Sequence, residues 1–167
     1  MSRFVLLMAC LALASRAFAE QLPHDGQTIG YGELEEEWRG EVIHLSWSPR
    51  AFVVKKFLSD EECDYLVGKA EPMMTESGVV DNDTGHSKKS EVRTSTGTFF
   101  GRGQDEVITK IEKRVAQVTM IPVENQEGLQ VLHYKDGQKY EPHYDYFHDA
   151  LNQRPENGGQ RLVTMLM

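Results

Sequence analysis

The chain is poor in cysteine, in basic residues and in long apolar runs. Each shortage excludes or disfavours a class of structure or function. It has 2 cysteines in 167 residues, and Cys10 lies in the apolar start, so Cys63 has no partner for an internal disulfide. A disulfide between Cys63 and a cysteine outside these residues remains an alternative. Lys and Arg number 18 against 26 Asp and Glu. This acidic balance disfavours nucleic-acid binding, which depends on clustered Lys and Arg.

The longest apolar run, residues 4–14, is too short to cross a bilayer as a helix. It predicts a secretory signal peptide over residues 1–19, with a basic start at Arg3 and a small-residue cleavage pattern at Ala17 and Ala19. We therefore expect the lumen of the endoplasmic reticulum or Golgi, with a short membrane anchor as the less favoured alternative. Loss of Arg3 and Arg16 would take the net charge from −8 to about −10. Residues 20–40, acidic and glycine-bearing, predict a mobile leader.

The rest of the chain mixes strand and helix patterns. Residues 50–57 predict a strand, and Ser59 and Glu62 form a capping box that opens a helix ending at Pro72. A second helix is expected over residues 104–119, before Pro122. The apolar stripes of both helices predict a buried core. Residues 81–91 predict a mobile loop, either a lid or a solvated connection, with a glycosylation sequon at Asn82.

The most informative pattern is His143-Tyr-Asp145. Residues 129–134 and 140–147 are predicted as two strands of a hairpin that turns at Asp136-Gly137. Side chains two apart on a strand share a face, so His143 and Asp145 are expected to point at one place. An imidazole and a carboxylate are two of the three ligands of the facial triad that holds non-haem Fe(II). The third ligand is expected from elsewhere, with His148 as a second choice because strand alternation puts it on the other face.

Beyond this pair, several blocks carry a family resemblance: residues 45–53, 57–63, 91–95, 129–134 and 160–167. With the His-x-Asp block they resemble the prolyl 4-hydroxylases of plant and algal type, among the Fe(II)/2-oxoglutarate dioxygenases. The resemblance implies an α+β domain over residues 41–167, built on a double-stranded β-helix (jelly-roll) core with helices packed outside. The resemblance also implies that the loop of residues 81–91 folds over a bound peptide substrate.

The resemblance also implies the chemistry of a complete enzyme. Such an enzyme hydroxylates C4 of peptidyl proline in proline-rich secreted proteins, using Fe(II), 2-oxoglutarate and O2, with ascorbate supporting turnover. By position in the motifs, the resemblance assigns metal binding to His143 and Asp145, 2-oxoglutarate binding to Tyr134, Thr164 and Leu166, and substrate binding to Arg93, Tyr140 and Arg161. The plainer readings are a cross-strand aromatic for Tyr140 and surface ion pairs for the two arginines.

The sequence departs from the family pattern in one respect. The second metal-binding His and the Lys that pairs with the distal carboxylate of 2-oxoglutarate are expected after the strand that contains Thr164, and Met167 is the last residue given. We therefore interpret the chain as the N-terminal portion of a hydroxylase. By itself it is expected to be weakly active or inactive. The alternatives are a module that binds proline-rich peptides without catalysis and an unproductive fragment.

Overall fold

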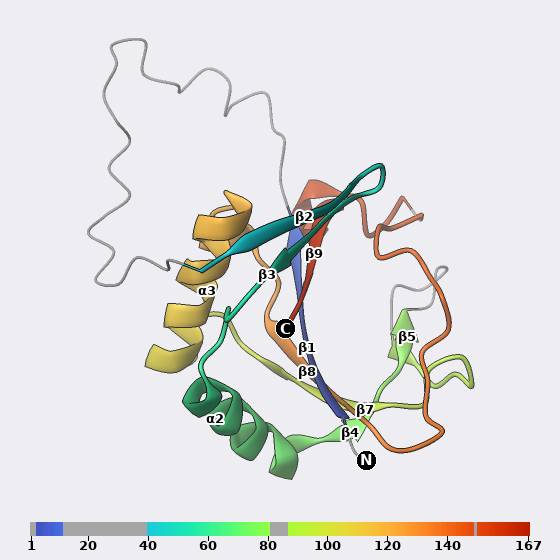
Figure 1. The fold of residues 1–167 in the computed structure, drawn as a ribbon. Helices are drawn as coiled ribbons and strands as arrows, with labels where there is room; N and C mark the ends of the chain where they lie inside the picture. Colours follow the sequence, from blue (N-terminus) through green and yellow to red (C-terminus); the bar gives the residue numbers. More distant parts are fainter. Residues whose placement is uncertain (1–2, 12–39, 81–86, 149) are drawn as a thin grey trace, which may run out of the picture.

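The computed structural model of the chain describes residues 3–11, 40–80, 87–148 and 150–167. These residues form a five-stranded antiparallel sheet, two separate two-stranded ladders and two α-helices (Figure 1). The arrangement agrees with the α+β class expected from the sequence. The jelly-roll core stays a prediction, because the described strands form a single larger sheet and two small ladders.

The five-stranded sheet has the order β4 (Thr75–Glu76), β7 (Thr96–Phe100), β8 (Leu129–Tyr134), β1 (Arg3–Leu11) and β9 (Arg161–Leu166). The bounds of β8 are those predicted. β1 joins β8 to β9, and it lies within the predicted signal peptide, whose residues 1–2 and 12–19 lie outside the described residues. The signal peptide therefore stays a prediction. The predicted acidic leader also lies outside the described residues, except for Gly40.

The two small ladders are hairpins. β2 (Val42–Trp47) pairs with β3 (Arg50–Val54), and β5 (Val79–Val80) pairs with β6 (Ser87–Lys88). β3 is shorter than the predicted strand over residues 50–57, because the chain turns at Lys56, whose φ is 51°. Most of the predicted loop before residue 87, Asn82 included, lies outside the described residues.

Both predicted helices are present. Ser59 caps α2 (Asp60–Ala70) through the expected capping box with Glu62, and the following 3-10 turn η1 (Glu71–Met73) contains Pro72. The Asp105 carboxylate accepts a hydrogen bond from the Ile108 N–H and caps α3 (Glu106–Thr119). Two more 3-10 turns, η2 (Val123–Asn125) and η3 (Pro155–Asn157), precede β8 and β9. Neither described helix is long and apolar enough to cross a membrane.

The core lies between these two helices and strands β7 and β8. Figure 1 shows α2 and α3 on the same side of the five-stranded sheet, and the irregular segment after β8 on the other side. Ion pairing joins the helices, because Arg114 on α3 contacts both carboxylate oxygens of Glu62 on α2 at 2.8 Å. Cys63 is half-buried, and burial raises the pKa of its thiol. The buried apolar cluster is formed by Phe57, Leu66, Ala70, Phe100, Ile108, Ile111, Val115, Ile121, Leu129 and Val131.

Candidate metal and peptide site

The segment that contains His143 and Asp145 is irregular, so the predicted strand over residues 140–147 is wrong. The turn at Asp136-Gly137 forms as predicted, with Gly137 at φ 82°, but the chain does not return along β8. Residues 139–141 pair with residues 92–94 instead: Thr94 N–H donates to the Lys139 carbonyl and Glu141 N–H to the Val92 carbonyl, both at 2.9 Å. Pro142 has no N–H with which to continue a ladder.

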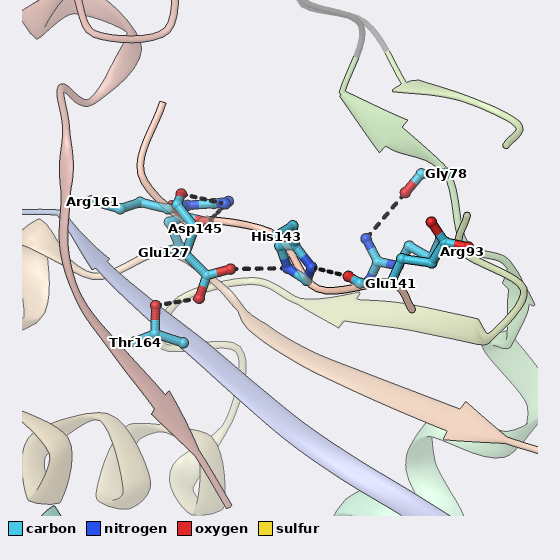
Figure 2. A network of polar contacts seen from close by, with 8 residues as sticks. All are labelled: Gly78, Arg93, Glu127, Glu141, His143, Asp145, Arg161 and Thr164. Carbon is cyan, nitrogen blue, oxygen red and sulfur yellow. Dashed lines mark hydrogen bonds and ion pairs between the residues drawn. The ribbon is translucent and has the colours of Figure 1, made fainter. Parts of the chain in front are cut away.

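His143 and Asp145 nevertheless converge, for a reason other than strand alternation. His143 Nδ1 lies 2.7 Å from the Glu141 carbonyl oxygen, which can only accept, so Nδ1 carries the proton in the neutral ring (Figure 2). Nε2 then holds a lone pair, and it faces Asp145 Oδ1 at 3.2 Å. A lone pair facing a carboxylate oxygen favours a cation between them, either a proton or a metal ion.

The separation of these two atoms fits a metal ion. Two ligands about 2.1 Å from one ion and at a right angle to each other are about 3.0 Å apart, close to the observed 3.2 Å. Both side chains are partly exposed, at 38% for His143 and 30% for Asp145, which leaves room for further ligands. Within the part of the chain that the structure describes, no third His, Cys, Asp or Glu completes a cluster with them.

His148, the second-choice ligand, belongs to a different group of side chains. Its ring lies 4.6 Å from that of Tyr146 and 6.0 Å from that of Tyr144. The rings of these two tyrosines are 5.0 Å apart, and both are exposed. His148 therefore forms part of an aromatic patch beside His143 and Asp145, the candidate metal-binding residues, which are called the metal pair below.

Other side chains of the same region form two stacks. The Tyr140 ring stacks on His143 at 3.7 Å and 23°, and the Arg93 guanidinium lies 4.7 Å from the Tyr140 ring centre. Arg93 NH1 donates to the Gly78 carbonyl at 3.0 Å, while its Nε and NH2 are buried without a hydrogen-bond partner among the described residues. Unsatisfied buried donors carry a free-energy cost.

The second stack is centred on Arg161. Its guanidinium lies 4.7 Å from the Phe147 ring centre and pairs with Glu127 through two contacts, at 2.5 Å and 2.7 Å. Burial alone would lower the pKa of Arg161, but hydrogen bonds to Glu127 and the charges of Glu127 and Asp145 outweigh it and raise that pKa. Arg161 is therefore a fixed cation beside the metal pair.

Both stacks and the metal pair open on one cavity of about 510 Å³. Its walls include Arg93, Tyr140 and Arg161, so the structure brings together the three predicted substrate residues with His143 and Asp145.

The three residues predicted to bind 2-oxoglutarate are not grouped in this way. Tyr134 lies opposite Arg3 in the β8–β1 ladder and Thr164 lies opposite Ala9 in the β1–β9 ladder. Arg3 and Ala9 are six positions apart along β1, which is roughly 20 Å. Leu166 is 67% exposed on β9. Of the three, the Thr164 side chain reaches the metal pair, because its hydroxyl donates to Asp145 Oδ2 at 2.5 Å (Figure 2).

Sequence reasoning missed Glu127, Phe147 and Gln160. Glu127 pairs with Arg161, and the Gln160 side-chain amide contacts both the N–H and the carbonyl of Phe147, at 2.6 Å and 2.8 Å. Glu127 and Gln160 each precede a strand, where a polar residue has many roles. The sequence could predict that an acidic residue pairs with Arg161, but it could not predict which one.

Comparison of the sequence with known proteins gives the family of the chain. The chain belongs to the prolyl 4-hydroxylase family of plant type. No family model matches the chain.

Three relatives from Arabidopsis thaliana carry this assignment. The chain is 59% identical over 138 residues to probable prolyl 4-hydroxylase 3, across 83% of this chain and 46% of the relative. It is 59% identical over 135 residues to prolyl 4-hydroxylase 5, across 80% and 46%. It is 47% identical over 170 aligned positions to probable prolyl 4-hydroxylase 8, across 96% and 58%. The chain thus spans about half the length of the curated relatives that it matches.

Proposed function

We propose that this chain is the metal-binding and peptide-binding part of a 2-oxoglutarate-dependent prolyl 4-hydroxylase that modifies proline-rich secreted proteins. The proposal rests above all on the His143 Nε2 lone pair, which faces Asp145 Oδ1 at 3.2 Å on the wall of the cavity of about 510 Å³. Oxygen and imidazole nitrogen donors with open positions suit Fe(II). The names of relatives at 47–60% identity support the hydroxylase class.

In this proposal Fe(II) would supply the activation of O2 and 2-oxoglutarate that oxidises C4 of proline. His143 contributes Nε2, because its Nδ1–H is held by the Glu141 carbonyl, and Asp145 contributes Oδ1. The second metal-binding His and the Lys for 2-oxoglutarate that the family resemblance implies are not assigned among the described residues.

On the peptide side, Arg93, Tyr140 and Arg161 line the wall of the same cavity. In this proposal these side chains contact the substrate from the wall, with the Tyr140 ring packing on a prolyl ring. An extended polyproline II chain suits such a wall, because its carbonyls are free of internal hydrogen bonds.

Tyr134, Thr164 and Leu166 remain the proposed contacts for 2-oxoglutarate. β1 now joins the strands that contain them, and it falls within the segment 1–19 that we propose is removed as a signal peptide. Its removal would free the facing edges of β8 and β9. The same proposal places the enzyme in the lumen of the endoplasmic reticulum or Golgi, with ascorbate supporting turnover.

The test compares succinate release by the full-length protein with release by its His143→Ala and Asp145→Ala variants, on a proline-rich peptide. Both variants should lose more than about 100-fold in activity, because each removes a metal ligand, while their melting temperatures stay near that of the parent. Tyr144→Ala, which removes the exposed neighbour between the two ligands, is the matched control. Succinate release at the parent's rate in either ligand variant would exclude the metal assignment.

A further inference from the structure

The segment 143–147 has no strand ladder of its own, so something else must fix the direction of the Asp145 carboxylate. The neighbouring strand β9 supplies the contacts. Gln160, just before β9, holds the Phe147 backbone at N–H and carbonyl, at 2.6 Å and 2.8 Å. Arg161 NH1 reaches the Asp145 carbonyl at 3.4 Å.

The contact nearest to the chemistry comes from Thr164. Its hydroxyl donates to Asp145 Oδ2 at 2.5 Å, and Oδ2 is the carboxylate oxygen that does not face His143. The hydroxyl thus connects the irregular segment to strand β9.

We propose that Thr164 is a positioning residue for the metal site: its hydroxyl occupies Asp145 Oδ2, so that Oδ1 alone is presented beside His143 Nε2. A carboxylate held in this way binds a metal ion through one oxygen, and a coordination position that a second oxygen would fill stays open. Hydrogen bonds that orient ligating carboxylates in this way contribute strongly to metal affinity. This inference rests on the proposed function, because it takes His143 and Asp145 as the ligands.

The test titrates the whole chain with Co(II) alone and measures the dissociation constant by calorimetry, so that no activity is needed. Thr164→Val keeps the shape of the side chain and removes the hydroxyl, and it should weaken Co(II) binding by about 10-fold to 100-fold. Thr164→Ser keeps the hydroxyl and should restore binding to within about threefold of the parent, which a purely structural role for the methyl group does not predict.

A matched control lies on the same strand. Val163→Thr adds a hydroxyl where Thr164→Val removes one, and residue 163 lies on the other face of β9. This variant should leave the Co(II) affinity unchanged. Thermal melting of each variant checks that β9 stays folded, and a Thr164→Val loss of affinity at an unchanged melting temperature supports the inference.

Three results would overturn the inference, and they are distinguishable. If His143→Ala abolishes Co(II) binding while Thr164→Val binds like the parent, Thr164 has no positioning role and the metal assignment stands. If His143→Ala binds Co(II) like the parent, both the metal assignment and the role of Thr164 are wrong. Loss of binding in Thr164→Val and Thr164→Ser alike would also contradict the role of the hydroxyl.

Discussion

The helix-covered core and the site segment are built in different ways. In the core, Phe100, Ile108 and Ile111 are fully buried, and β7 and β8 hold each other through a five-residue ladder. In the site segment, residues 140–148 are mostly exposed and are held by a few contacts from residues 92–94, Gln160 and β9. The core therefore derives its stability from many redundant contacts, while the geometry of the site depends on a few replaceable ones.

The largest expected effect tests whether the core needs the N-terminal strand. Deletion of residues 1–19 removes β1 and with it two ladders, to β8 and to β9. We expect a lower free energy of unfolding than in any point variant below, because both ladders are lost. Urea unfolding of the two forms checks this. Deletion of residues 1–2, which leaves β1 intact, is the control, and equal urea midpoints for the 1–19 deletion and the parent would mean that the core is independent of β1.

Two neighbouring phenylalanines of one strand allow the core and the site to be compared directly. Phe100 is fully buried on β7, while Phe99 is 59% exposed and lies on the wall of the cavity. Phe100→Ala should reduce the free energy of unfolding by about 3–5 kcal/mol, because it opens a cavity in the core. Phe99→Ala should change it by less than about 1 kcal/mol. Chemical denaturation measures both, and similar losses in the two variants would contradict the burial contrast.

The same contrast explains how far the sequence could be read. The capping box at Ser59, the second helix and strand β8 were predictable because apolar periodicity and local hydrogen bonding agree there. The strand over residues 140–147 was not, because alternating aromatic and polar residues look the same in a strand and in a segment held by side chains. His143 and Asp145 were correctly expected to converge, but for the wrong reason.

The cavity wall at Arg161 carries a smaller prediction, which rests on the proposed function. Glu127→Gln removes the charge that pairs with Arg161 and should loosen its guanidinium. A partly buried ion pair of this kind is worth about 1 kcal/mol, so we expect about a fivefold weaker affinity for a proline-rich peptide. Fluorescence anisotropy with a labelled peptide measures this. Glu124→Gln, at an exposed position nearby, is the control. Equal affinity in the parent and Glu127→Gln would show that Arg161 needs no partner to bind peptide.

The smallest effect concerns two carboxylates that join the helices and loops of the core. Burial raises the pKa of Glu112, which is 1% exposed and accepts hydrogen bonds from the Gly103 N–H. Burial acts in the same direction on Glu62, but hydrogen bonds from Arg114 and the Ser59 N–H outweigh it and lower that pKa. The two residues therefore contribute pH dependences of opposite sign to stability.

For Glu112, the folded protein keeps its proton at a pH where the unfolded chain has lost it. The contribution of Glu112 to stability is complete below the ordinary pKa of glutamate and falls as pH rises through the raised pKa of Glu112. The contribution of Glu62 is present above the ordinary pKa and falls as pH drops through the lowered pKa of Glu62. Glu112→Gln should therefore remove the loss on the alkaline side and leave stability at pH 7 equal or higher, while Glu62→Gln should be destabilising there. Denaturation at a series of pH values from 3 to 8 measures both slopes, with the exposed Glu91→Gln as control. A Glu112→Gln variant that is less stable than the parent at pH 7 would mean that the charged Glu112, held by Gly103, stabilises the start of α3 more than its burial costs.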